Sequence, residues 1–84
     1  MTREAVQTQL WEFIRRELLK KPTFQVKEDE PLITGGVLSS YYLVQIALFI
    51  ENTFGVHLDD AELTPETMDT LAMMTDRVMK ELQQ

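Results

Sequence analysis

The sequence predicts an all-α fold: a bundle of three main helices and one short helix, with a long loop between the first and the second. Apolar residues recur at helical spacing in three separate stretches of the chain. Prolines and glycines fall between these stretches, where they stop one helix and let the chain turn toward the next. The 84 residues are enough for one domain, so we expect residues 1–84 to fold as a single unit.

The first helix is expected from Thr2 to about Lys20. Thr2 is a suitable N-cap, and Pro22 should stop the helix. Basic residues crowd its last turns, where cations complement the helix dipole, and they are Arg15, Arg16, Lys20 and Lys21. The stripe that should face the core consists of Val6, Leu10, Phe13, Ile14 and Leu18, with Trp11 beside it as partial core.

Residues 22–38 contain two prolines and two adjacent glycines but no sustained apolar period, which predicts a long ordered loop. A loop longer than roughly 12–15 residues is uncommon in a compact domain and is often functional. Four apolar side chains should anchor it on the helices: Phe24, Val26, Leu32 and Ile33.

The second helix is expected to begin at Ser39 or Ser40, with Ser39 as N-cap, and to run to about Thr53. Gly55 should end it. The core stripe is Leu43, Ile46, Ile50 and Phe54, whereas the opposite side carries Tyr41, Val44 and Leu48. A helix that is apolar nearly all round is either buried or contacted by a partner. Because so short a chain cannot bury all of it, we expect contact with a partner.

Two more helices are expected after Gly55. Asp59–Glu62 has the form of a helix start, although Pro65 limits that helix to about one turn. The last helix should run from about Thr67 or Asp69 to Leu82. Its apolar face consists of Leu71, Met74, Val78 and Leu82.

Charge is distributed unevenly along the chain. The formal net charge is −6, and the stretch from Glu28 to Asp76 holds ten of the fourteen acidic residues but no Lys or Arg. This argues against nucleic acid as a partner and favours basic proteins. The chain has no cysteine, and it shows no signal-peptide pattern and no apolar run long enough to span a membrane. We expect a soluble, cytoplasmic monomer.

A particular order of motifs runs through the chain. Gly35-Gly36-Val37-Leu38-Ser39-Ser40-Tyr41 leads into the second helix, Phe54-Gly55 ends it, and Glu62 and Met68-Asp69-Thr70-Leu71 follow. From about Phe13 onward, in order, spacing and acidity, the chain resembles the acyl carrier protein family. That family is a four-helix bundle whose serine, in an Asp-Ser-Leu motif, bears a phosphopantetheine arm. The matching triplet is Ser39-Ser40-Tyr41, so the resemblance implies 4′-phosphopantetheine from coenzyme A on Ser40, with Ser39 as cap and neighbouring hydroxyl.

A serine hydroxyl at a helix start suits this attachment physically. It is exposed and lies beside backbone N–H groups that have no partner within the helix. Those groups and the positive end of the helix dipole favour a phosphate. No activating base is needed, because a separate transferase would supply the chemistry. Accordingly we expect no catalytic residue, and His57 stands apart from Ser40 in the sequence.

The resemblance implies a carrier rather than an enzyme. A phosphopantetheinyl transferase would load it, and acyl-loading and acyl-processing enzymes with basic patches would dock on it. The cargo would be an acyl thioester of fatty-acid, polyketide or related specialised biosynthesis, sheltered between the second and last helices. The expected partner-binding residues are Tyr41, Val44, Gln45, Leu48, Glu51, Asp59, Asp60 and Glu62. The acidic turn lacks the spacing of a calcium loop, so no metal site is expected.

Four positions depart from the family pattern. Ser39 stands where the family has Asp, Tyr41 replaces Leu, and Gln45 and Asn52 stand where acids are expected. These departures favour a specialised carrier that docks largely through apolar contact. Two alternatives stay open: an aminoacyl or peptidyl carrier with the same arm, and an unmodified interaction module with the same fold.

Overall fold

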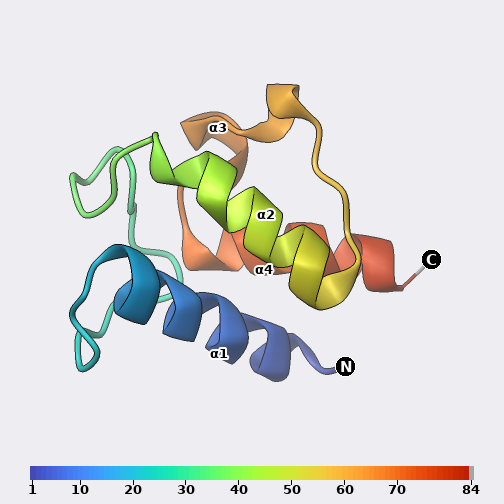
Figure 1. The fold of residues 1–84 in the computed structure, drawn as a ribbon, viewed down its shortest axis with the longest axis horizontal. Helices are drawn as coiled ribbons and strands as arrows, with labels where there is room; N and C mark the ends of the chain where they lie inside the picture. Colours follow the sequence, from blue (N-terminus) through green and yellow to red (C-terminus); the bar gives the residue numbers. More distant parts are fainter. Residues whose placement is uncertain (84) are drawn as a thin grey trace.

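The computed structural model describes residues 1–83, and in that range the chain is helical with no strand (Figure 1). The all-α prediction is confirmed. The three main helices are α1 (Arg3–Phe13), α2 (Tyr42–Phe54) and α4 (Leu71–Leu82). The short elements are a π-helical turn, η1 (Ile14–Leu18), a 3₁₀ turn, η2 (Asp60–Glu62), and α3 (Pro65–Met68). α1 packs along α4, and α2 lies between α1 and α3 in this view (Figure 1).

α1 begins at its predicted cap, since the Thr2 hydroxyl accepts the N–H of Ala5 at 3.1 Å. The helix widens into η1 and ends at Leu18. Lys20 then takes a left-handed backbone conformation with φ 56°, and the N–H of Lys21 donates to the carbonyl of Arg15 at 2.8 Å. A left-handed residue followed by a long backward bond is a common way to end a helix. The helix therefore stops before Pro22 is reached.

The loop before α2 is held against the junction of α3 and α4. The N–H of Leu32 donates to the carbonyl of Asp69 at 2.7 Å, and the N–H of Ala72 donates to the carbonyl of Glu28 at 2.8 Å. Leu32 is fully buried as predicted, and Leu38, which was not a predicted anchor, is buried as well. The other predicted anchors are half-buried against the core, and they are Phe24, Val26 and Ile33.

α2 begins later than predicted, at Tyr42, because a turn precedes it. The Ser39 hydroxyl accepts the N–H of Tyr41 at 3.2 Å, and the Ser39 carbonyl accepts the N–H of Tyr42 at 3.0 Å. A serine that binds the N–H two residues further on favours a turn over a helix. Ser39 and Ser40 thus lie before the helix instead of opening it. Gly55, with φ 72°, ends α2 as predicted.

The last helix was predicted to begin at Thr67 or Asp69, and this was wrong. α3 ends at Met68, and α4 starts separately at Leu71. Thr70 takes an extended conformation between them, and its hydroxyl accepts the N–H of Met73 at 3.0 Å, which makes it the cap of α4. The short helix predicted over Asp59–Glu62 is confirmed as η2.

One cluster of buried apolar side chains joins the three main helices. The predicted stripes supply most of it: Val6, Leu10, Ile14 and Leu18, then Leu43, Ile46 and Ile50, then Leu71, Met74 and Val78. Trp11 is also buried, and its indole N–H donates to the Phe24 carbonyl at 3.1 Å. Phe13 and Phe54 are only half-buried, and Leu82 is 40% exposed, so these three predicted members are not among the buried core residues. Within residues 1–83, no helix combines the length and apolarity needed to cross a membrane.

Candidate functional site

Ser40 lies in the turn that leads into α2, and it is exposed. None of the hydrogen bonds formed among residues 1–83 involves its hydroxyl, whereas the Ser39 hydroxyl is bonded to the N–H of Tyr41. The carbonyl of Ser40 accepts the N–H of Leu43 at 3.1 Å, which fixes the backbone of the serine at the helix entrance. Both serines are exposed, and the two hydroxyls differ in that the one of Ser39 is engaged in a hydrogen bond.

The expectation of free backbone N–H groups beside this serine is wrong for the three residues that follow it. The N–H groups of Tyr41, Tyr42 and Leu43 are bonded to oxygens of Ser39 and Ser40. They are occupied because the turn supplies acceptors that an abrupt helix start would lack. The dipole of α2 remains as the local feature that favours a phosphate.

The loop that leads to Ser40 is tight and bonded to Asp69. A Cβ atom at Gly35 would lie 2.2 Å from the carbonyl oxygen of Pro31, so this position requires glycine. The Asp69 carboxylate accepts the N–H of Ile33 at 2.8 Å, the N–H of Thr34 at 2.9 Å and the hydroxyl of Thr34 at 2.6 Å. These bonds, that of the Thr34 hydroxyl first, hold the pKa of Asp69 below its ordinary value. Nothing near Asp69 in the sequence indicates this role.

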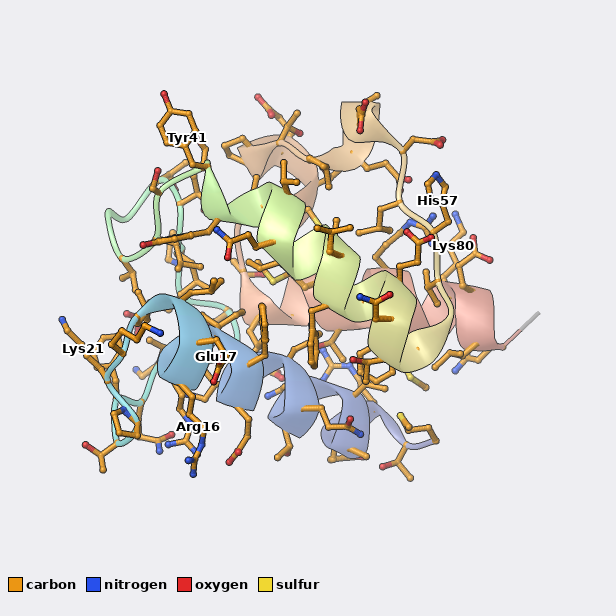
Figure 2. All side chains as sticks on the ribbon, in the orientation of Figure 1. Arg16, Glu17, Lys21, Tyr41, His57 and Lys80 are labelled. Atoms are coloured by element: carbon orange, nitrogen blue, oxygen red, sulfur yellow. The ribbon has the colours of Figure 1, made fainter. Side chains whose placement is uncertain are left out.

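The outer side of α2 is apolar and exposed. Tyr41, Val44 and Leu48 are 87%, 55% and 54% exposed, and Tyr41 projects outward at the start of the helix (Figure 2). The prediction that this side stays uncovered in the chain itself is confirmed. Leu48 also borders a groove of ≈ 290 Å³, together with Phe13, Gln45, Phe49 and Asn52. The rings of Phe13 and Phe49 stack with centroids 4.3 Å apart, so α1 contributes to this surface as well.

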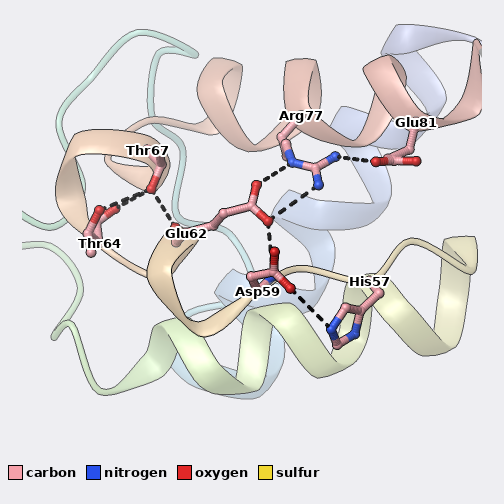
Figure 3. A network of polar contacts seen from close by, with 7 residues as sticks. All are labelled: His57, Asp59, Glu62, Thr64, Thr67, Arg77 and Glu81. Carbon is pink, nitrogen blue, oxygen red and sulfur yellow. Dashed lines mark hydrogen bonds and ion pairs between the residues drawn. The ribbon is translucent and has the colours of Figure 1, made fainter.

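The acidic side chains predicted to bind partners fall into two groups. Glu51, Asp59 and Asp60 are exposed. His57 lies between the first two: its Nδ1 is 3.5 Å from a Glu51 oxygen and its Nε2 is 3.7 Å from an Asp59 oxygen. Figure 3 shows His57 beside Asp59 at the edge of a larger network of polar contacts. All of these groups are accessible to a basic partner.

Glu62 differs from its neighbours because its carboxylate is engaged within the chain (Figure 3). Its oxygens accept from Arg77 Nε at 2.6 Å and Nη2 at 3.4 Å, and from the N–H of Asp59 at 2.9 Å. Arg77, and then the N–H of Asp59, lower the pKa of Glu62. Arg77 also bonds Glu81 at 3.2 Å. Glu62 thus joins η2 to α4.

The methionines of α3 and α4 pack in or beside the core. Met68 and Met74 are fully buried, and Met73 and Met79 are half-buried. Two cavities, of ≈ 300 and ≈ 290 Å³, border α1. An acyl chain between α2 and α4 would therefore require these flexible methionines to move apart.

Among the described residues, no group of three or more His, Asp or Glu side chains is arranged to hold a metal ion. A scan against protein-family models finds no match, and searches of curated proteins and of solved structures find none either. The likeness to acyl carrier proteins therefore stays a prediction, which depends on the order of motifs and on the position of Ser40.

Proposed function

We propose that this chain is a carrier protein that holds acyl groups as thioesters on a 4′-phosphopantetheine arm attached to Ser40. The observation that carries the proposal is the contrast between the two neighbouring hydroxyls. Both residues are exposed, but the Ser40 hydroxyl makes no hydrogen bond within residues 1–83, whereas the Ser39 hydroxyl is bonded to the N–H of Tyr41. A transferase can reach Ser40 without breaking a contact of the fold.

The loading step needs little from the chain itself. The Ser40 hydroxyl oxygen attacks the β-phosphorus of coenzyme A, and a P–O bond to the serine forms. The P–O bond of the pyrophosphate breaks, adenosine 3′,5′-bisphosphate leaves, and the hydroxyl proton passes to a base of the transferase. The role of the chain is to present the serine at the positive end of α2, which stabilises the phosphodiester product.

The proposed docking surface follows α2 from the serine to the acidic turn. Its apolar part is the exposed row Tyr41, Val44 and Leu48, with Gln45 beside it. Its charge comes from Glu51, Asp59 and Asp60, which are exposed. The Glu62 carboxylate is already bonded to Arg77 and to the N–H of Asp59. Glu62 therefore supports the surface by holding η2 in place, more than by contacting the partner itself. A basic patch around an apolar pocket is the partner surface that fits this arrangement.

The test is to incubate the purified chain with coenzyme A and a broad-specificity phosphopantetheinyl transferase and to measure its intact mass. Wild type and Ser39→Ala should each gain one phosphopantetheine group, and Ser40→Ala should gain none. Circular dichroism of both variants checks that they are folded. If several transferases leave wild type unmodified, the carrier proposal is wrong, and the exposed face of α2 then favours an unmodified interaction module. Whether the loaded chain accepts acyl or aminoacyl groups separates the two kinds of carrier.

A further inference from the structure

A cavity of ≈ 300 Å³ lies beside α1, and its lining includes no residue of the Ser40 turn or of α2. Its volume is at the lower end of the range of about 300–1,000 Å³ in which small-molecule sites fall. Its walls combine apolar and polar side chains, and none belongs to the proposed docking surface. The residues that line it are Gln7, Thr8, Trp11, Glu12, Arg15, Gln25, Val26 and Leu71.

Arg15 is the unusual member of this lining. Its side chain is only 14% exposed, and its Nη2 pairs with an oxygen of Glu12 at 2.6 Å. Its Nε is buried and has no hydrogen-bond partner within the described chain. Buried donors are nearly always paired, because water lost on burial must be replaced by another acceptor. Because Arg15 lines the cavity, a ligand oxygen there becomes such an acceptor once the guanidinium group turns its Nε–H toward the cavity.

The charges around the cavity favour an anion. Glu12 pairs with Arg15 and also with Arg16, whose Nε lies 3.1 Å from the second Glu12 oxygen. One carboxylate between two guanidinium groups leaves one positive charge in excess. Arg16 in η1 and Lys21 just after it lie at the same end of the first helical segment, and the acidic Glu17 lies there as well (Figure 2). A second carboxylate near Arg15 would balance this charge, and a hydrogen bond between a guanidinium N–H and a carboxylate is strong because both groups are charged.

We propose that this cavity binds a small monocarboxylate with a compact apolar body. The carboxylate accepts the free Nε–H of Arg15. The apolar body lies against Trp11, Val26 and Leu71, while Gln7 and Gln25 belong to the polar part of the lining. This site is separate from the proposed carrier function, since it uses neither Ser40 nor the outer face of α2.

Trp11 makes the test direct, because it is the only tryptophan of the chain and lines the cavity. The unmodified full chain is titrated with cyclohexanecarboxylate and, as a matched neutral control, with cyclohexanecarboxamide. We expect the carboxylate to change the Trp11 fluorescence and to shift the NMR signal of the Arg15 Nε–H group. The amide should bind about tenfold more weakly, since it lacks the charge. Equal binding of the two compounds, or no change in either signal, would overturn the proposal.

Two variants locate the contact. Arg15→Lys keeps the charge but removes the Nε donor, and it should weaken carboxylate binding about tenfold. Arg16→Lys is the matched control, since Arg16 is 55% exposed and does not line the cavity, and it should bind as wild type does. If both variants bind equally well, Arg15 is not the ligand contact and the proposal is wrong. If Arg15→Lys fails to fold, the shift of the Arg15 Nε–H signal in wild type on addition of the carboxylate still shows whether Arg15 contacts the ligand.

Discussion

The carboxylate of Asp69 binds Thr34 twice, through its N–H at 2.9 Å and its hydroxyl at 2.6 Å. The two residues lie 35 positions apart, so this contact joins the loop before α2 to the junction of α3 and α4. The N–H of Ile33 adds a third bond to the same carboxylate. The loop reaches the turn at Ser40 a few residues later. The path by which the loop approaches Ser40 is therefore fixed partly by Asp69, a residue distant in the sequence.

Removing this carboxylate should destabilise the fold. Asp69→Ala leaves three donors of the loop without their acceptor, and we expect the free energy of unfolding to fall by about 2 kcal/mol. Asp29→Ala is the control, since Asp29 is exposed in the same loop, and its effect should be close to zero. Urea denaturation followed by circular dichroism measures both. Equal effects of the two variants would show that the bonds of Asp69 contribute nothing particular.

The same carboxylate should make stability depend on pH. The pKa of Asp69 is lower in the folded chain than its ordinary value, because the bonds from Thr34 and Ile33 favour the ionised form. Its contribution to stability is therefore full above the unfolded-state pKa, about 3.9, and is lost as pH falls through the lower folded-state pKa. Between about pH 6 and pH 3, wild type should lose more stability than Asp69→Asn, which cannot ionise. Parallel pH profiles of the two proteins would contradict this.

The Arg77–Glu62 pair should be stronger than the Arg3–Glu28 pair. The first has side chains 22% and 26% exposed, and the second 37% and 50%. A double-mutant cycle with Glu62→Gln and Arg77→Met should give a coupling of about 1 kcal/mol, reduced by salt. The corresponding cycle for Arg3 and Glu28 should give a smaller value, because solvent screens exposed charges. A coupling energy larger for Arg3–Glu28 than for Arg77–Glu62 would contradict this prediction.

The two sides of α2 should respond differently to truncation. Ile46 is fully buried, so Ile46→Ala should lower the free energy of unfolding by about 3 kcal/mol. Leu48, two residues further on, is 54% exposed, and Leu48→Ala should change it by less than about 1 kcal/mol. Thermal denaturation ranks the two variants. If Leu48→Ala is as destabilising as Ile46→Ala, the outer face of α2 is covered in solution.

Local signals in the sequence were sufficient for most of the helices. The Thr2 cap, the end of α2 at Gly55 and the single turn at η2 each depend on neighbouring residues, and each is where it was predicted. The buried stripes follow from spacing alone, as do the exposed positions of Tyr41 and Leu48. Periodicity captures these features because burial repeats with the helix.

The features that were missed depend on contacts that sequence spacing does not reveal. α2 starts late because the Ser39 hydroxyl accepts the N–H of Tyr41, and this hydrogen bond forms a turn before the helix. The break between α3 and α4 coincides with Asp69, whose partners lie in a distant loop. The cavity at Arg15 requires the loop to return beside α1, which no local pattern predicts.

Two main-chain bonds connect the loop to the last part of the chain, one from Leu32 to Asp69 and one from Ala72 to Glu28. The loop cannot swing outward without breaking its contact with the start of α4. Its larger motions therefore belong to infrequent partial unfolding rather than to the fast fluctuations of a free loop. The amide hydrogens of Leu32 and Ala72 should accordingly exchange with solvent slowly and at similar rates. A group attached at Ser40 would then move by rotation about its own bonds, while the backbone that carries it stays in place.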